Sequence, residues 1–404
     1  MKYIIILCDG MADEPLDELG GRTPLEAART MNMDSLAKVS EIGMVRTVPA
    51  GMAPGSDTAN LSVIGYDPKE YYTGRSPLEA LSIGADMAPD DVSFRCNLVT
   101  LSEEENRYED RHILDHSSGE ISTEEAAELL EALSEGLKRE GYTFYVGTSY
   151  RHLLIQKKGK VTELTAPHDI LTKQIGEYLP EDGVLREMMV KSYDILKDHP
   201  VNKRRRTEGK NPANSAWFWG AGTRPALRSF EEKNGVKGAM ISAVDLLKGI
   251  AVGAGMDNIV VEGANGGLDT NYAGKAQAAV KALTEDGYDF VYVHIEAPDE
   301  MGHQGSFQDK ITAIERIDEQ IIGPVRTALE DAGTDFRMLI LPDHPTPVRV
   351  RTHTSDPIPY LLYDSTEYIA GMDTYSEKTG KQTGVFVEKG YRLMDHLLEK
   401  DTEQ

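Results

Sequence analysis

Cysteine and positive charge are both scarce in this sequence. The 404 residues include two cysteines, Cys8 and Cys96. Two cysteines cannot build a disulfide framework or a cysteine-rich zinc site, and they favour a reducing, cytoplasmic environment. Lysine and arginine total 43 against 67 aspartates and glutamates, which gives a formal net charge of −24. This charge disfavours binding to nucleic acid or anionic membranes, so an anionic substrate would have to be attracted by bound metal or by a local cluster of cations.

Long hydrophobic runs are also missing. The apolar run at residues 3–8 is too short for the core of a secretory signal, and it stops at the charged Asp9. No stretch is long enough to span a bilayer, so we expect neither a membrane segment nor a membrane partner. Hydrophobic residues make up 40% of the chain, which is ordinary for a globular protein, and the length predicts two domains.

Three short apolar runs rich in β-branched residues are present, at residues 3–8, 290–295 and 338–341. Such runs are typical of buried parallel strands. Each is followed closely by an aspartate. In open α/β sheets, ligands bind beyond the carboxyl ends of the strands. The three runs therefore predict one shared site, built from opposite ends of the chain.

Helical patterns lie between these runs, at residues 24–39, 274–283 and 309–328, with Thr23 as a candidate N-cap of the first. Alternation of strand and helix predicts an α/β fold with a doubly wound sheet.

The middle of the chain has a different pattern. Strands are expected at 94–101 and 144–156, and helices at 123–140 and 182–197. A charged, turn-rich segment follows at 203–212, which we interpret as a solvated hinge. We expect residues 91–214 to form a smaller α+β domain, inserted into a core domain made of 1–90 and 215–404.

Candidate metal ligands cluster in the C-terminal half. Asp299 and His303 are four residues apart, so one helical turn would place both on the same face. Asp343 and His344 follow a predicted strand, and His353 comes shortly after. Each fragment alone is equally typical of a surface acid or a capping residue. Together, carboxylates and imidazoles at strand ends predict a site for a divalent metal ion.

Ser56 is the candidate nucleophile, in the loop 54–60. The preceding glycine lets the backbone approach a ligand closely, and a helix starting near Asp57 would favour phosphate at its N-terminus. The alternative is that Ser56 or Asp57 only caps this helix. A serine hydroxyl needs a base or a metal ion to become a good nucleophile at neutral pH, and the predicted metal site would supply one.

The ordered set of motifs resembles 2,3-bisphosphoglycerate-independent phosphoglycerate mutase, in its shorter, archaeal-type form within the alkaline phosphatase superfamily. The resemblance extends over nearly the whole chain. The matching segments are Cys8-Asp9-Gly10, Gly55-Ser56-Asp57-Thr58-Ala59, the run from Tyr71 to Ala80, Asp299 through His303, Asp343-His344 and His353-Thr354.

This resemblance implies an alkaline-phosphatase-like core, two divalent metal ions and a phosphoserine intermediate. Mn²⁺ is the expected ion, with Mg²⁺ or Zn²⁺ as alternatives. One site would be formed by Asp299, His303 and His353, and the other by Asp9, Asp343, His344 and the Ser56 oxygen. The implied activity is the interconversion of 3-phosphoglycerate and 2-phosphoglycerate, an isomerase reaction of glycolysis and gluconeogenesis.

The organic part of such a substrate carries a carboxylate and needs cations, of which arginine is favoured because it binds in a bidentate manner. The candidate substrate-binding residues are Arg75, Arg111, Asp115, Arg151, His152, Arg224 and Lys248. One departure from the family stands out. An arginine-rich stretch is expected in the inserted domain, whereas this chain has Asp115-His116-Ser117-Ser118-Gly119-Glu120.

That departure leaves a second function open, a metal-dependent phosphotransferase acting on another small hydroxyl compound such as homoserine. A plain phosphatase, or a metal-binding protein without activity, is a third reading. The large inserted domain argues against the phosphatase, since a phosphatase transfers the phosphoryl group to water and needs no domain to bind an acceptor. The sequence has no Walker-type loop, which argues against an ordinary P-loop kinase.

Overall fold

The computed structural model describes residues 1–399 and divides into two compact units. The first unit consists of Met1–Tyr72 and the chain from Leu227 onward, and the second is Thr73–Ala226. The sequence predicted domain boundaries after residues 90 and 214, so the second unit is longer at both ends than expected. No helix among the described residues is long and apolar enough to cross a membrane.

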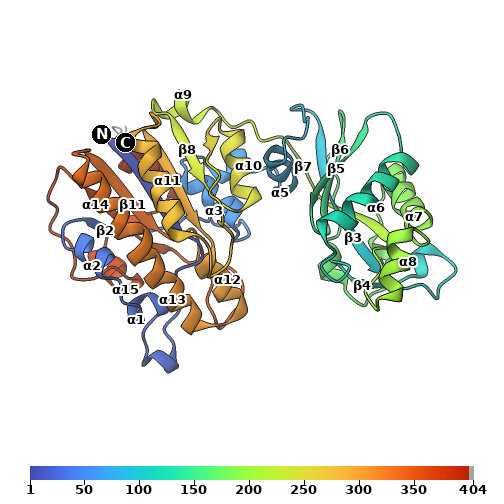
Figure 1. Cartoon of the computed structure of the whole chain (residues 1–404), viewed down its shortest axis with the longest axis horizontal. Helices are drawn as coiled ribbons and strands as arrows, with labels where there is room; N and C mark the ends of the chain where they lie inside the picture. Colours follow the sequence, from blue (N-terminus) through green and yellow to red (C-terminus); the bar gives the residue numbers. More distant parts are fainter. Residues whose placement is uncertain (400–404) are drawn as a thin grey trace. The chain divides into compact units, whose positions relative to one another are not determined.

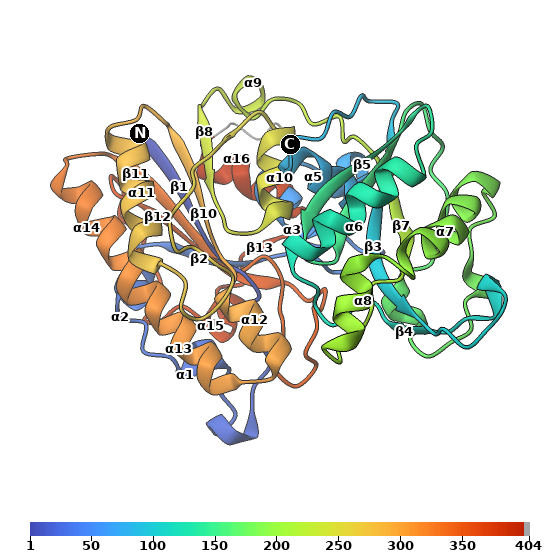
Figure 2. The ribbon, with the colours of Figure 1, turned by 45° about the vertical axis from the view of Figure 1, so that its right-hand side comes forward.

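The first unit is built on an eight-stranded sheet with the order β13-β2-β12-β11-β1-β10-β8-β9. Its strands are β1 (Lys2–Cys8), β2 (Glu41–Val45), β8 (Gly238–Ile241), β9 (Asp257–Asn258), β10 (Phe290–Ile295), β11 (Phe336–Leu341), β12 (Ile358–Asp364) and β13 (Phe386–Val387). Strands β11, β1, β10 and β8 are parallel neighbours, and β12 runs antiparallel to β11 and β2. Figure 2 shows β1 between β11 and β10. The three predicted strands are therefore confirmed, and they lie side by side.

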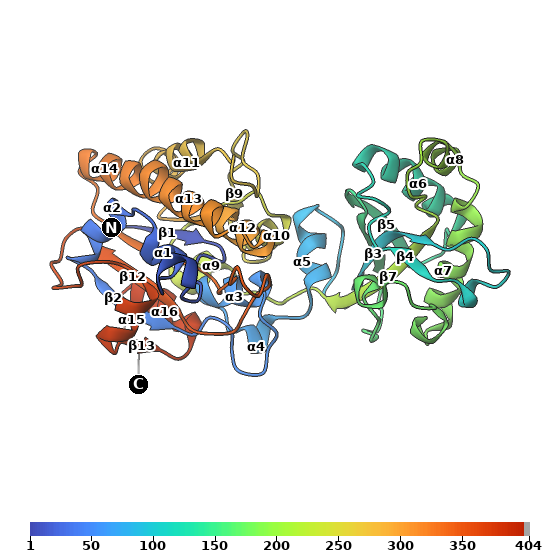
Figure 3. The same cartoon turned by 90° about the horizontal axis from the view of Figure 1, so that it is seen from below.

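Helices cover both faces of this sheet, as the alternation of elements predicts. The helices of the unit are α1 (Pro24–Ala27), α2 (Met31–Ala37), α3 (Ser56–Val63), α4 (Pro68–Tyr71), α9 (Phe230–Asn234), α10 (Asp245–Gly253), α11 (Tyr272–Thr284), α12 (Ala297–Gln304), α13 (Phe307–Ile317), α14 (Gly323–Asp331), α15 (Glu377–Thr383) and α16 (Leu393–Leu397), with short turns η1 (Asp17–Leu19), η5 (Asp318–Ile322) and η6 (Gly390–Arg392). Figure 1 shows α11, α13 and α14 along one face of the sheet, and Figure 3 shows α16 on the other side.

The core explains this arrangement. Ile4, Ile6 and Cys8 of β1 pack in one buried cluster with residues of α11 and α13. Ile5 and Leu7 are also fully buried but point to the opposite face, because side chains alternate along a strand. A strand buried on both faces needs a continuous apolar run, and this is the pattern of residues 3–8.

Two predicted helices of this unit differ from the observed ones. The single helix expected at 24–39 is two helices, α1 and α2, separated at residues 28–30. Thr23 caps α1 in a capping box with Glu26, as predicted. The helix expected at 309–328 is α13 and α14, joined by the π-helical turn η5.

The second unit is an α+β structure with an antiparallel sheet. Its strands are β3 (Val92–Leu101), β4 (Ile113–Asp115), β5 (Tyr142–Thr148), β6 (Arg151–Gln156) and β7 (Ser215–Thr223). Strand β3 is central and pairs with β4, β6 and β7, while β5 pairs with β6.

The helices of this unit are α5 (Arg75–Ser82), α6 (Thr123–Gly136), α7 (Gly183–Leu196) and α8 (Pro200–Thr207), with turns η2 (Tyr108–Asp110), η3 (Pro167–Ile170) and η4 (Gly176–Tyr178). Helices α6 and α7 bury Phe94, Cys96 and Leu154 of the sheet in one core, and Figure 1 shows both helices on the same side of β3. Helix α5 packs on β3 and β7, and for this reason the unit begins before residue 91.

Two predictions in this unit were wrong in detail. The single strand expected at 144–156 is a hairpin of β5 and β6. The first half of the segment 203–212, expected as a charged hinge, belongs to helix α8, which ends at Thr207. Pro200 occupies its first turn and the side chain of His199 caps it. Arg205 of this helix is buried and pairs with Glu125, so the basic run is partly structural rather than solvated.

Candidate active site

Three neighbouring strands of the first unit end at one edge of the sheet, and each is followed by an acidic side chain. Asp9 follows β1, Asp343 follows β11, and Asp299 lies in the first turn of α12, which begins just after β10. Because β11, β1 and β10 are parallel, their carboxyl ends meet at this edge. The structure therefore brings together the three strand ends for which the sequence predicts one shared site.

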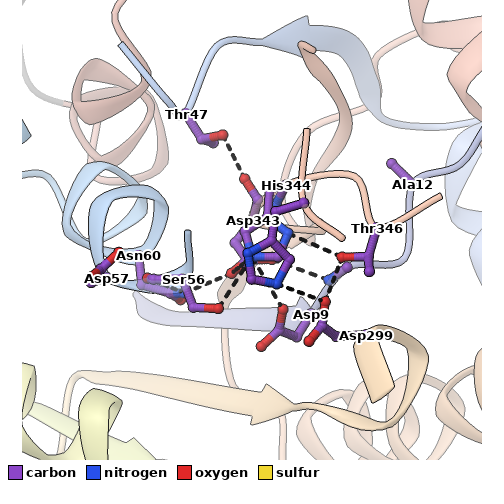
Figure 4. Close-up of polar contacts among 12 residues, drawn as sticks. Asp9, Ala12, Thr47, Ser56, Asp57, Asn60, Asp299, Asp343, His344 and Thr346 are labelled. Atoms are coloured by element: carbon purple, nitrogen blue, oxygen red, sulfur yellow. Dashed lines mark hydrogen bonds and ion pairs between the residues drawn. The ribbon is translucent and has the colours of Figure 1, made fainter. Parts of the chain in front are cut away.

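One group of side chains at this edge is deeply buried. Asp9, Asp343 and His344 are each at most 2% exposed. Nε2 of His344 lies 3.3 Å from Oδ2 of Asp343, 3.7 Å from Oδ1 of Asp9 and 3.1 Å from the hydroxyl of Ser56. Figure 4 shows these side chains converging. Ser56 is the first residue of α3, as the sequence analysis expected, and Gly55 rather than Ser56 is the N-cap.

A second group is more open. Asp299 and His303 lie one turn apart on α12, and Nε2 of His303 is 3.1 Å from Oδ2 of Asp299. Nε2 of His353 is 3.1 Å from Nε2 of His303 and 3.4 Å from Oδ1 of Asp299. The rings of His344 and His353 are 4.0 Å apart between centroids, so the two groups are continuous. All seven predicted metal and nucleophile residues are thus brought together.

A tight backbone approach joins the elements of the site. Gly10 adopts φ +59°, and a Cβ at this position would lie 2.6 Å from Oδ1 of Asp299 and 2.5 Å from Oγ1 of Thr346. Only glycine fits there, because it has no side chain and tolerates a positive φ. Its N–H donates to Oδ1 of Asp343 at 3.1 Å. Gly10 therefore lets the loops after β1, β10 and β11 close upon one another.

The electrostatics of the site are those of negative charges crowded in a buried space. Burial, together with the charges of Asp343 and Asp299, raises the pKa of Asp9 well above its usual value. Burial would also raise the pKa of Asp299, but hydrogen bonds with His303 and His353 hold it well below its usual value. The Asp299 carboxylate raises the pKa of His303 to about 9. A bound cation would relieve the repulsion among these carboxylates.

The donor atoms fit divalent metal ions. Two sets of side chains place one ligand atom each within 4.8 Å of the others, namely Asp299 with His344 and His353, and Asp9 with Asp343 and His344. Oδ1 of Asp9 is buried and has no hydrogen-bond partner, which is costly for a carboxylate oxygen unless a cation binds it. Carboxylate and imidazole ligands suit Mn²⁺ and Zn²⁺.

Three buried residues of the site were missed by the sequence analysis. His294 contacts Asp9, Asn60 donates to Asp343 at 2.8 Å, and the hydroxyl of Thr346 contacts both Asp299 and His344. His294 left a weak signal, because it is one of ten histidines and lies inside an otherwise apolar strand. Asn60 and Thr346 left none, since Asn60 contacts Asp343 from 283 residues away and Thr346 contacts Asp299 from another loop.

The predicted substrate-binding residues are more scattered. All but one lie in the second unit: Arg75, Arg111, Asp115, Arg151, His152 and Arg224. Lys248 lies on α10 of the first unit and pairs with Asp245 at 3.2 Å. Arg75 begins α5, where it pairs with Glu79 at 3.4 Å and is partly exposed, and Arg224 is exposed after β7. The structure does not bring these seven residues into one cluster within either unit.

Two of these residues, Asp115 and Arg111, already interact with neighbouring side chains or backbone groups of the second unit. Asp115 accepts hydrogen bonds from Ser117, Gly119 and Asn211, and these donors outweigh burial to hold its pKa below the usual value. Buried Arg111 stacks on the ring of Tyr193, 3.9 Å from its centroid.

His152 and Arg151 are neighbours in sequence with opposite environments. His152 is 1% exposed, and its Nδ1 accepts from the N–H of Gly147 at 3.1 Å. Arg151 is exposed, lies near the ring of Tyr150, and takes part in none of the ion pairs between described residues. The two side chains point to opposite faces of the sheet, and Arg151 is the first residue of β6, the only position of this strand that is exposed.

Comparisons with known proteins point to one family. Residues 37–202 match the model of a family described as 2,3-bisphosphoglycerate-independent phosphoglycerate mutase. A protein of that name from Methanosarcina acetivorans is 50% identical over 404 residues, covering 98% of this chain and 100% of that protein. A solved structure from Pyrococcus horikoshii is 32% identical with a TM-score of 0.82, covering 100% of this chain and 98% of the other. A cofactor-independent phosphoglycerate mutase from Thermoplasma acidophilum is 30% identical with a TM-score of 0.68, covering 99% of each chain.

Proposed function

The chain belongs to the 2,3-bisphosphoglycerate-independent phosphoglycerate mutases, which interconvert 3-phosphoglycerate and 2-phosphoglycerate, and we propose that Ser56 carries the phosphoryl group between the two hydroxyls. The observation that supports this role is the position of the Ser56 hydroxyl. It lies at the first residue of α3, 3.1 Å from Nε2 of His344. The same nitrogen is 3.3 Å from Asp343 and 3.7 Å from Asp9. A helix N-terminus favours a phosphate through its free N–H groups and its dipole.

We propose that two divalent ions are held by the residues that the structure brings together. One set is Asp9, Asp343, His344 and Ser56, and the other is Asp299, His303 and His353. When bound, such ions would lower the pKa of the Ser56 hydroxyl and neutralise charge on the phosphoryl oxygens. Mn²⁺ is the ion that we expect, because the mixed carboxylate and imidazole set suits it, with Mg²⁺ and Zn²⁺ as alternatives.

The reaction then has two balanced halves. Ser56 loses its proton and its Oγ forms a bond to phosphorus, while the donor oxygen of phosphoglycerate leaves and takes up a proton. Glycerate stays bound. Its other hydroxyl then loses a proton and attacks the phosphoserine, and Ser56 regains its proton. The net change is the position of the phosphoryl group on glycerate, with no cosubstrate consumed.

We propose that the carboxylate and phosphate of the substrate are bound by Arg151, with Arg75, Arg224 and Lys248 as further candidates. Arg75 and Lys248 are paired with acids, whereas Arg151 and Arg224 are exposed and form no ion pair with a described acid. Arg224 already donates to the backbone oxygen of Met87 at 3.2 Å, so Arg151 is the strongest of the four. The proposal leaves out His152 and Arg111, which are buried, and Asp115, whose oxygens already accept several hydrogen bonds. We also propose a cytoplasmic location, with which the two free, buried cysteines agree.

Metal removal tests this function directly. Treatment with a chelator should abolish the interconversion of the two phosphoglycerates, and added Mn²⁺ should restore it. Elemental analysis should find close to two ions per chain. Full turnover in the presence of the chelator, with no metal in the protein, would contradict the two-metal proposal. Thermal unfolding of the chelated protein serves as the control for loss of structure.

A further inference from the structure

The two buried carboxylates of the site are held in very different ways. Oδ1 of Asp343 accepts from the N–H groups of Gly10 and His344, at 3.1 and 2.9 Å, and its Oδ2 accepts from Asn60 at 2.8 Å. Asp9 has one hydrogen-bond donor among the described residues, Nε2 of His294, 2.8 Å from Oδ2. Its Oδ1 is buried and has none. The orientation of Asp9 therefore depends on a single side chain.

The contacts of His294 define which of its nitrogens carries the proton. An ionised Asp9, the form that a metal ligand requires, only accepts hydrogen bonds, so Nε2 then donates to it at 2.8 Å. In a neutral imidazole, Nδ1 is then an acceptor. The hydroxyl of Ser242 lies 3.1 Å from Nδ1, and the same oxygen accepts from the N–H of Val244 at 3.0 Å. The hydroxyl hydrogen of Ser242 is thus left to point at Nδ1, which matches the tautomer that Asp9 requires.

This chain of contacts runs across three adjacent strand ends. Ser242 follows β8, His294 is the penultimate residue of β10, and Asp9 follows β1, and these strands are parallel neighbours. His294 pairs in register with Leu7, two residues before Asp9. The imidazole therefore spans the gap between neighbouring strands at the level of the site, and its side chain is fully buried.

We propose that His294 is a positioning residue that holds Oδ2 of Asp9 and leaves Oδ1 free to bind a metal ion, and that Ser242 holds His294 in the tautomer that can do this. The inference rests on the proposed function, in which Asp9 is a metal ligand. It assigns roles to two residues that lie outside the proposed sets of metal ligands. Residues that hydrogen-bond to a metal ligand orient that ligand and raise the affinity for the metal. Their replacement typically lowers metal affinity by about 10- to 100-fold.

If His294 had only a structural role, the expected effect of replacing it would be different. Nζ of Lys275 donates to the backbone oxygen of His294 at 2.9 Å, which ties α11 to β10 whatever the side chain is. If the imidazole only filled space in the core, its replacement would lower stability and leave metal affinity alone. Metal affinity is therefore the measurement that separates the two roles.

The experiment is calorimetric titration of the chelator-treated full chain with Mn²⁺ alone. His294→Phe keeps a ring but removes both nitrogens, and it should weaken one of the two binding events by about 10- to 100-fold while leaving the other unchanged. His294→Gln can place an amide N–H near the position of Nε2 and should restore most of the lost affinity. Ser242→Ala should weaken the same event to a smaller extent.

Val293→Ala is the matched control, because Val293 is a buried neighbour on the same strand that points to the other face. It should lower the melting temperature without changing either affinity. Unchanged affinities in a folded His294→Phe variant, or a Gln variant as weak as the Phe variant, would overturn the inference. If His294→Phe does not fold, Ser242→Ala decides, and wild-type affinity in that variant overturns it. A wild-type chain that binds no Mn²⁺ would instead overturn the proposed function.

Discussion

The two units arrange their chemically active side chains in opposite ways. In the first unit, acids and histidines follow neighbouring parallel strands and contact one another within 3.7 Å. In the second unit, the exposed candidate cations lie on different elements: Arg151 on β6, Arg75 at the start of α5 and Arg224 after β7. A parallel sheet gathers every strand end of one kind at one edge, whereas an antiparallel sheet divides them between two edges. The fold of the first unit therefore concentrates the site, and that of the second does not.

Replacement of the nucleophile should give the largest effect. Ser56→Ala removes the oxygen that receives the phosphoryl group, while α3 keeps its Gly55 cap. Interconversion of the phosphoglycerates should fall by at least about a thousandfold, the scale seen when a covalent nucleophile is lost. Rapid quenching and peptide analysis of the parent protein during turnover should find phosphate on Ser56.

Ser62 on the same helix provides the control. Its hydroxyl donates to the backbone oxygen of Thr47 rather than facing the site, so Ser62→Ala should retain most of the turnover. Near-normal turnover in Ser56→Ala would falsify the covalent route, and the concentration of chemistry in the first unit would then need another explanation.

The contrast between the two units also explains which parts of the site could be predicted from the sequence. Asp9, Asp299 and Asp343 were predictable because each comes shortly after an apolar strand, so that local sequence and position in the fold coincide. The full ligand set, with His303 and His353, came from the resemblance to the family. His294 and Asn60 were not predictable, because their roles arise from Asp9 and Asp343, 285 and 283 residues away. No local pattern carries such information.

In the second unit, even the elements were harder to predict. The turn between β5 and β6 contains Ser149 and Tyr150 rather than an Asn-Gly pair, and Ser149 adopts a positive φ that nothing in its local sequence announces. The basic run of α8 looked solvated because the acid that neutralises Arg205, Glu125, lies 80 residues earlier. Charge alone does not distinguish an exposed segment from one that is paired across the fold.

The pH dependence of stability should reveal His152 as a structural residue of the second unit. Burial lowers its pKa to about 4, from an ordinary value of 6.5. Between these values the unfolded chain binds more protons than the folded one, so stability is complete above about pH 6.5 and falls as the pH drops to 4, by at most about 3 kcal/mol. Below pH 4 this residue adds no further loss.

Tryptophan fluorescence makes this measurement selective, because Trp217 and Trp219 are the only tryptophans and both lie on β7 of the second unit. Urea unfolding followed by fluorescence at several pH values should show the loss, and His152→Gln should flatten the curve. Identical pH slopes in the two proteins would assign the loss to other groups.

The smallest expected effect concerns Arg151, and it tests whether the second unit contributes to the reaction at all. If its guanidinium binds the carboxylate or phosphate of the substrate, Arg151→Ala should lower turnover by about 10- to 100-fold, the cost of losing a charge-assisted pair. Metal binding should be unchanged, because the proposed ligands are all in the first unit. The share of phosphate released to water should rise, since glycerate that is loosely held escapes before the phosphoryl group returns.

Arg186→Ala is the matched control, an exposed arginine of the same unit on α7, and it should leave both rates unchanged. Arg151→Lys keeps the charge but not the planar fork, so its turnover should lie between those of wild type and Arg151→Ala. Turnover and hydrolysis are measured on the same preparation, by coupled assay and by release of inorganic phosphate. If Arg151→Ala and Arg186→Ala behave alike, Arg151 has no role in binding. If Arg151→Ala lowers turnover without raising hydrolysis, the guanidinium acts before the phosphoryl group leaves the substrate and not in holding glycerate afterwards.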